Sequence, residues 1–238
     1  VQSIEKVLHT HLKTAEFIMA DEIHEFAKGK VTTAAIGSFH NAIFRFGFTA
    51  TVPSDRFSRL NLVSRLGQVI SEVGVQDLID EGWLTDFDLH IVDSPSVIED
   101  GDEDMSYDEV YAKHIIYSEK RNECIWQIVD DIKRKGPCKV LILVKNLDHA
   151  KILHELIEDS YKLEGSDDMT KRKSVVKQFC ESEHGVLIGT KIFQTGINIP
   201  EITHLINARG LKSEIATIQA LGRALRIHKS KTKVGMYD

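Results

Sequence analysis

The sequence has few of the residues and segments that mark secreted, disulfide-bonded or membrane proteins. It contains three cysteines in 238 residues, and none forms the C-x-x-C pair of a zinc or redox site, so we expect reduced, partly buried thiols. No apolar run reaches the roughly 18 residues that a membrane helix needs. Residues 1–10 also lack the basic and apolar regions of a signal peptide. These absences predict a cytoplasmic protein that contacts no membrane.

A further absence concerns nucleotide binding. The phosphate-binding pattern G-x-x-x-x-G-K-[ST] occurs nowhere in the chain, so the backbone cradle that this loop makes for phosphates is not among these residues. What is present is a globular composition, with 42% hydrophobic and 28% charged residues. The net charge of −6 is uneven, because acidic residues concentrate in 99–109 and basic residues in 223–233. The net charge therefore does not exclude a polyanionic partner that binds local Lys and Arg side chains.

Short apolar runs alternate with helix-like stretches along much of the chain. This order predicts an α/β fold in which parallel strands are joined by right-handed crossover helices. The expected strands are 17–20, 44–48, 140–144, 161–163, 186–188, 204–206 and 234–237, and the clearest expected helices are 148–159 and 170–180.

An acidic stretch at residues 96–110 has neither the strand period nor the helix period. Together with its Gly and Ser residues, this indicates a linker or a surface insertion. We expect it to separate the closing part of one domain, residues 1–95, from a nearly complete second α/β domain, residues 111–238. The first domain is then incomplete at its amino-terminal side.

Two adjacent carboxylates, Asp21 and Glu22, directly follow the first predicted strand. Ligands of open parallel sheets bind at the carboxyl ends of the strands. There, Asp21 would hold Mg²⁺ through its hydration shell, and Glu22 would orient and deprotonate an attacking water. The alternative is a plain helix start, with Asp21 as the cap and Glu22 next to the positive end of the helix dipole.

Two arginines stand near the carboxyl end in the string Gln219 to Arg226. Helical spacing predicts that Gln219, Arg223 and Arg226 share one face of a helix that begins near residue 213, with Gly222 leaving room beside them. Two guanidiniums on a rigid element suit a phosphate whose charge spreads during transfer. A solvated basic helix face is the alternative, but it explains neither Gln219 nor Gly222.

Small polar residues follow two other predicted strands. Thr49 and Thr51 come after strand 44–48 and could relay the state of a nucleotide through hydrogen bonds. Thr190 begins a loop punctuated by Gly and Pro, where it could hold a nucleic-acid phosphate. In both places an ordinary turn or connection is the alternative.

Taken in order, these segments resemble motifs II to VI of superfamily 2 helicases, with a DEAH-like motif II. The matching segments are 21–24, 49–51, 143–146, 189–200 and 219–226. Within that superfamily, residues 17–24, 46–51 and 121–122 are similar to the phage UvsW-type branch-migration DNA helicases. The resemblance implies two RecA-like domains with ATP and Mg²⁺ in the cleft between them. It also implies a nucleic acid lying across both domains, with DNA favoured over RNA.

The resemblance implies roles for individual residues. The catalytic residues would be Asp21, Glu22, Arg223 and Arg226; the nucleotide-binding and coupling residues His24, Thr49, Thr51, Gly196, Asn198 and Gln219; and the nucleic-acid-binding residues Asn146, Thr190 and Lys191. In particular, His24 would couple the nucleotide site to Gln219. The sequence departs from the family pattern at Asn198, where an acidic residue is common, and at Gln194 and Thr195, which replace the charged residue usual before Gly196.

We therefore interpret the chain as part of an ATP-dependent helicase or translocase whose phosphate-binding loop lies upstream of residue 1. The 238 residues alone are then expected to be inactive. Two alternatives remain at this stage: a helicase-like nucleic-acid-binding module without ATPase activity, and the motor subunit of a restriction enzyme. An upstream phosphate-binding loop or a nuclease domain in the complete gene would distinguish them.

Overall fold

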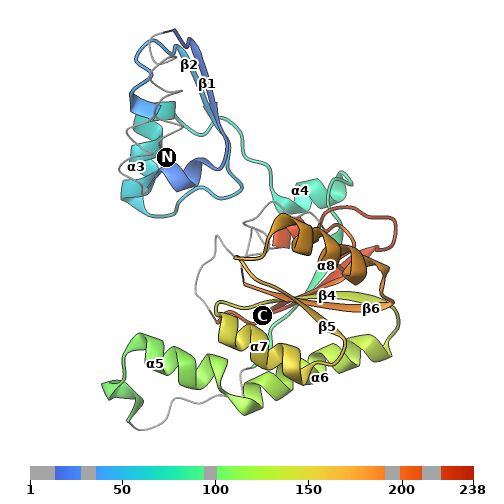
Figure 1. Ribbon diagram of the computed structural model, residues 1–238. Helices are drawn as coiled ribbons and strands as arrows, with labels where there is room; N and C mark the ends of the chain where they lie inside the picture. The colour runs from blue at the N-terminus through green and yellow to red at the C-terminus, as the bar shows by residue number, and fades with distance from the viewer. Residues whose placement is uncertain (1–13, 28–35, 94–100, 191–198, 211–220) are drawn as a thin grey trace. The chain divides into compact units, whose positions relative to one another are not determined.

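The computed structural model describes residues 14–27, 36–93, 101–190, 199–210 and 221–238 (Figure 1). The chain forms two compact units, Val1–Val73 and Gly74–Asp238. In the described part of the chain, no helix is long and apolar enough to cross a membrane.

The first unit contains a pair of parallel strands, β1 (Phe17–Ala20) and β2 (Phe44–Gly47), in a register that places Ala20 opposite Gly47. A short 3-10 helix, η1 (Ile23–Phe26), follows β1, and helix α3 (Arg56–Leu66) follows β2. The helices pack tightly on β2, because a Cβ at Gly47 would lie 2.7 Å from Leu66 Cδ1 and 3.1 Å from Ile23 Cγ1. Glycine is therefore required at this close approach.

The second unit alternates strands and helices. In chain order its elements are α4 (Val75–Asp80), β3 (Asp86–His90), η2 (Asp102–Asp104), α5 (Tyr107–Tyr111), the π-helical turn η3 (Ala112–Ile116), α6 (Glu119–Arg134), β4 (Cys138–Leu143), α7 (Leu147–Leu156), β5 (Ser160–Leu163), α8 (Met169–Glu181), β6 (His184–Gly189), β7 (His204–Asn207) and β8 (Lys233–Tyr237).

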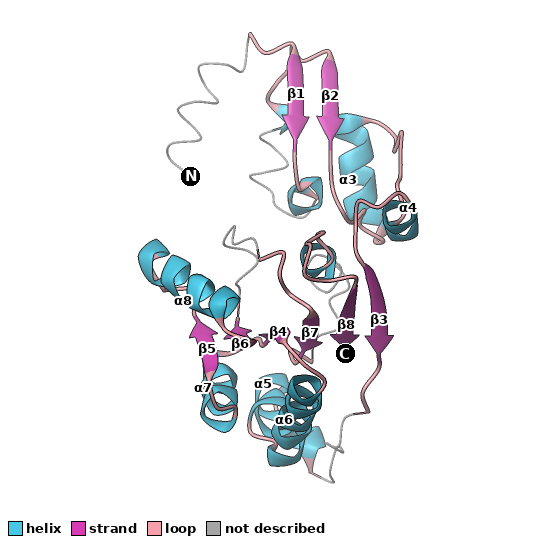
Figure 2. Cartoon of the chain, turned by 90° about the vertical axis from the view of Figure 1, so that its right-hand side faces the viewer, coloured by secondary structure: helices cyan, strands magenta, loops and turns pink. Residues whose placement is uncertain are grey.

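A single six-stranded sheet organises the second unit. Its strands are all parallel, in the order β3-β8-β7-β4-β6-β5. Figure 2 shows α8 on one face of the sheet and α6 and α7 on the other. The central strand β4 is buried on both faces, and its residues Val140, Leu141 and Ile142 are fully covered. A continuous apolar run such as this is typical of a parallel strand between two helical layers.

The α/β prediction is confirmed, and every predicted strand is present with small shifts at its ends. Strand β3 was not predicted. It lies at the edge of the sheet, and its exposed Asp86 and Asp88 both contact Lys233 Nζ, at 3.5 and 2.6 Å. Charged edge strands are common because they discourage pairing with other chains. Because of these charges β3 contains no continuous apolar run, and its sequence therefore did not indicate a strand.

The two units meet in sequence at Val73 and Gly74, earlier than the stretch 96–110 that the sequence indicated as a divider. The physical reason is the pairing of β3 with β8, which joins residues 86–90 to the second sheet. Part of the acidic stretch is also structured. Asp102 is buried and accepts hydrogen bonds from Lys113 Nζ at 2.9 Å and His114 Nε2 at 2.7 Å.

A buried polar network ties α6 to α7. His149 is fully buried, and its Nε2 lies 2.9 Å from Asn122 Oδ1. The Asn122 amide in turn donates to the carbonyl of Ile116 at 2.9 Å. Burial, helped by the positive Arg121, lowers the pKa of His149 from 6.5 to about 4. The folded protein therefore favours the neutral imidazole.

This pKa shift predicts that the protein loses stability in acid. Because the folded pKa of His149 is depressed, its contribution is complete above about pH 6.5 and is lost as the pH falls toward 4. Between pH 7 and pH 4.5, the unfolding free energy of His149→Gln should fall by roughly 2 kcal/mol less than that of the wild type. Urea unfolding at both pH values measures this. The exposed His154 of α7 supplies the matched control, His154→Gln. Equal losses in wild type and His149→Gln would contradict the prediction.

Candidate functional site

Backbone hydrogen bonds fix the turn after β1. The amide of Phe48 donates to the carbonyl of Ala20, and the amide of Ile23 donates to the carbonyl of Phe48, both at 2.9 Å. Glu22 lies between these two hydrogen bonds in the chain and adopts the left-handed conformation, with φ 49° and ψ 46°. A glutamate with positive φ is uncommon, and such strain gathers at functional sites. The fold thus holds Glu22 in a conformation that it does not favour on its own.

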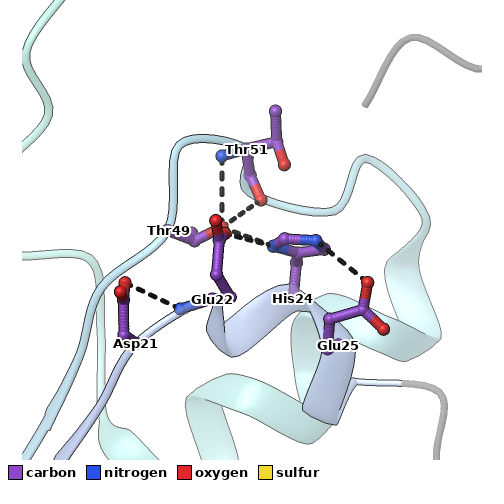
Figure 3. A network of polar contacts seen from close by, with 6 residues as sticks. All are labelled: Asp21, Glu22, His24, Glu25, Thr49 and Thr51. Carbon is purple, nitrogen blue, oxygen red and sulfur yellow. Dashed lines mark hydrogen bonds and ion pairs between the residues drawn. The ribbon is translucent and has the colours of Figure 1, made fainter. Parts of the chain in front are cut away.

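His24 connects η1 to the segment after β2 (Figure 3). The imidazole is buried, and its Nδ1 lies 2.8 Å from Thr49 Oγ1. The Thr49 hydroxyl donates to the carbonyl of Thr51 at 2.9 Å and accepts from the amide of Thr51 at 3.1 Å. Because a hydroxyl has one proton, this arrangement makes His24 Nδ1 the donor to Thr49. The predicted residues His24, Thr49 and Thr51 therefore form one hydrogen-bonded chain.

Two carboxylates flank His24. Glu22 Oε2 lies 3.4 Å from Nδ1, and Glu25 Oε1 lies 3.5 Å from Nε2. The Glu22 side chain is 47% exposed, but its Oε2 atom is covered and accepts no hydrogen bond in the described part of the chain. Asp21 Oδ1 accepts the amide of Glu22 at 2.8 Å. A buried carboxylate oxygen with spare accepting capacity is suited to take a proton from a water molecule.

The described residues contain no group of three or more His, Cys, Asp or Glu side chains that would form a protein-only metal site. Mg²⁺ needs no such cage, because it keeps several waters and commonly takes one or two carboxylates together with substrate phosphates. Asp21 directly follows β1 and is exposed, and its carboxylate points to the same side as that of Glu22 in Figure 3. The donor set thus fits a Mg²⁺ ion held partly by a phosphorylated ligand.

The two arginines lie in the second unit, and their placement differs in part from the predicted helix face. Residues 221–224 are helical and include Arg223, but the helix ends at Ala224. Arg226 lies beyond it in an isolated antiparallel bridge with Leu84. Its placement therefore depends on a second segment of the chain as well as on the end of the helix. Gln219 lies outside the described residues, as do Lys191, Gly196 and Asn198.

The carboxyl ends of β4 and β6 bring Asn146 and Thr190 to the same edge of the sheet, because Leu143 pairs with Gly189. Asn146 is the N-cap of α7, and its side chain makes no capping hydrogen bond. Thr190 is half-buried and directly follows β6. The structure thus brings these two predicted residues to neighbouring strand ends.

Lys145 and two tyrosines were missed by sequence reasoning. Lys145 Nζ lies 4.4 Å from the ring centroid of Tyr111 and 5.3 Å from that of Tyr107. Tyr111 is buried, and its hydroxyl donates to the carbonyl of Arg209. Burial raises the pKa of Tyr111 to about 12, which keeps that donor protonated. The available signal was a lysine immediately after a buried strand, beside the predicted Asn146.

Comparisons with known proteins agree with this architecture. Residues 120–228 match the family described as the helicase conserved C-terminal domain. The ATP-dependent DNA helicase uvsW of Enterobacteria phage T4 is 27% identical over 229 residues, which cover 93% of this chain and 45% of uvsW. The chain therefore spans less than half the length of this relative.

Two solved structures have a similar fold. A fragment assigned as the HsdR subunit of a type I restriction enzyme from Vibrio vulnificus YJ016 has a TM-score of 0.74 and 20% identity, covering 100% of this chain and 46% of that one. The ATP-dependent type ISP restriction-modification enzyme LlaBIII, bound to DNA, has a TM-score of 0.70 and 17% identity, covering 99% and 19%. The six-stranded unit is thus a RecA-like α/β domain. The family match and the similarity to uvsW together identify the chain as carrying a superfamily 2 helicase C-terminal domain.

Proposed function

We propose that the complete protein is an ATP-dependent nucleic-acid helicase or translocase, and that this chain supplies part of its ATP-hydrolysing motor. The observation that carries the proposal is the strand-end network of Glu22, His24 and Thr49, with its strained backbone and a carboxylate oxygen that accepts no hydrogen bond from the described residues. In this proposal the first unit is the later part of an ATP-binding RecA-like domain. The second unit is the partner domain, and the protein works in the cytoplasm.

Each residue of the network has a role in the proposed reaction. Glu22 accepts the proton of the attacking water, since its Oε2 contacts His24 but accepts no hydrogen bond from the described residues. Asp21 would hold Mg²⁺ through water, and the bound ion would neutralise negative charge on the phosphates. His24 and the two threonines link that carboxylate to the neighbouring strand, so a change at the phosphate site alters the segment after β2.

The second unit contributes positive charge to the same reaction. Arg223 and Arg226 stabilise the charge that develops on the transferred phosphoryl group. In this proposal hydrolysis needs groups from both domains, which couples it to movement. Gln219, Gly196 and Asn198 complete the nucleotide site in this proposal. Uniting residues from two domains allows hydrolysis to drive domain motion.

A nucleic-acid strand is proposed to bind where β4 and β6 end. Asn146, Thr190 and Lys191 contact its backbone, and Lys145 adds a positive charge beside Asn146. DNA is the favoured partner, because uvsW is named a DNA helicase and LlaBIII was solved bound to DNA. Contacts of this kind position a strand without reading its sequence.

Removal of the Lys145 charge tests this strand site. Lys145→Ala in the complete protein should weaken single-stranded DNA binding roughly threefold, and lower the slope of log affinity against log salt by about 0.7, because one phosphate contact is lost. Fluorescence anisotropy across a salt series measures both quantities. Lys151→Ala is the matched control, since Lys151 is an exposed residue of α7 that pairs with Asp148. Identical salt slopes for the two variants would exclude Lys145 from the site.

A restriction-enzyme motor is the second candidate, favoured by the fold similarity to the HsdR fragment and to LlaBIII. It uses the same ATP chemistry, so both candidates are expected to hydrolyse ATP. An ATPase assay with and without DNA tests this shared activity. DNA-stimulated ATP hydrolysis supports the motor, and its absence from the folded complete protein would favour a binding module without ATPase activity. DNA cleavage that depends on ATP would identify the restriction enzyme.

A further inference from the structure

Arg226 is held by a segment distant in sequence. The helix that contains Arg223 ends at Ala224, and the amide of Arg226 lies 3.4 Å from the carbonyl of Arg223, a long hydrogen bond. A shorter bond comes from elsewhere, because the amide of Thr85 donates to the carbonyl of Leu225 at 2.7 Å. Next to it, Leu84 and Arg226 form the antiparallel bridge. Residues 84 and 85 therefore hold the backbone at Arg226 together with the helical bond from the Leu225 amide to the carbonyl of Leu221 at 2.9 Å.

The segment that supplies this bond is itself anchored at both ends. On the amino-terminal side, the amides of Trp83 and Leu84 both donate to the carbonyl of Leu78 in α4, at 2.8 and 3.0 Å. On the carboxyl-terminal side, β3 begins at Asp86 and pairs with β8. Thr85 is buried, and Leu84 packs on the core cluster that contains Leu225. Such a segment resists displacement, because moving it breaks several hydrogen bonds at once.

Residues 84 and 85 lie close to the start of the second unit, shortly after α4. Gly74 follows Val73 of the first unit directly, and its amide is bonded to Asp77 Oδ2 at 3.0 Å, at the start of α4. From there the backbone runs through α4 and its closing turn to Leu84 and Thr85. The covalent connection between the units therefore leads into the backbone that holds Arg226.

We propose that residues 84 and 85 position Arg226, the arginine of the proposed ATPase site. The inference rests on the proposed function. An arginine that acts on a transition state must be placed closely, since a displacement of about 1 Å costs roughly a hundredfold in rate. The amide of Thr85 provides that placement by fixing Leu225, the residue before Arg226. Thr85 is a positioning residue, because it acts only through the backbone of its neighbour.

Thr85→Pro in the complete protein tests the proposal by removing the donating N–H. We expect kcat for DNA-stimulated ATP hydrolysis to fall roughly ten- to a hundredfold, while KM for ATP stays within about threefold, because binding is preserved and the transition-state contact is weakened. Thr85→Val keeps the N–H and the branched shape, so its kcat should stay within about threefold of wild type. A loss of the same size in Thr85→Val would overturn the proposal.

A double variant separates positioning from general damage. If Thr85 acts through Arg226, then Thr85→Pro combined with Arg226→Ala should be no slower than Arg226→Ala alone. Multiplicative losses would overturn the inference and leave the proposed function intact, whereas a fully active Arg226→Ala would overturn the proposed function itself. If Thr85→Pro does not fold, amide hydrogen exchange of the wild type decides. Slow exchange of the Thr85 amide, as in the core, supports the proposed positioning role, and rapid exchange contradicts it.

Discussion

Glu22→Gln is expected to lower ATP turnover by the complete protein by roughly a thousandfold, the scale of a lost general base. The substitution keeps the size of the side chain and removes the charge that accepts the proton of water. Binding of ATP and of DNA should stay within a few-fold of wild type, since Asp21 and the second unit are unchanged. Steady-state ATPase assays and nucleotide-binding titrations measure the two effects separately.

Glu25 provides the matched control for this prediction. It lies on the other side of His24, with Oε1 3.5 Å from Nε2, and its side chain is 77% exposed. Glu25→Gln removes the same charge close to the same imidazole, but away from the buried position of Glu22 Oε2. Its turnover should stay within a few-fold of wild type. Equal effects of the two variants, whether large or small, would remove Glu22 from the role of base.

Arg226→Ala is expected to lower the maximal ATPase rate by roughly a thousandfold or more, the scale for an arginine that stabilises phosphoryl-transfer charge. Arg226→Lys should recover only part of the rate, because an ammonium group lacks the planar fork that binds two oxygens at once. KM for ATP should change much less than kcat. Stopped-flow or coupled-enzyme assays at saturating ATP and DNA measure the rates.

The control for Arg226 is a surface arginine in the same unit. Arg134 on α6 forms a pair with Asp130 at 2.6 Å, and its side chain is 74% exposed. Exposed pairs of this kind contribute little to stability, so Arg134→Ala should keep both the rate and the melting temperature of wild type. An Arg226→Ala protein that melts early and loses rate only in proportion to its folded fraction would show that Arg226 is structural.

Local sequence patterns predicted a large share of the fold. The buried strand β4 reads as an apolar run, and the apolar spacing of α7 and α8 indicates helices, because these signals arise from residues close together in the chain. The pair Asp21 and Glu22 was also visible, since it follows strand β1 directly. Sequence reasoning assigned His24 and Thr49 separate coupling roles, with His24 expected to act on Gln219, and the contact of 2.8 Å between His24 and Thr49 is a finding of the structure.

The sequence by itself thus determined the type of fold and the residues of the strand-end network, because strand period, helix period and strand-end chemistry are local properties. Tertiary structure alone decided the place of β3, the division at Val73 and Gly74, and the bridge that holds Arg226. Each of these depends on hydrogen bonds between segments far apart in the chain. The helix before Arg226 ends at Ala224, and the amide of Thr85, about 140 residues earlier, bonds the next residue, Leu225. The local sequence cannot indicate a backbone amide as a hydrogen-bond partner, since every residue except proline has one.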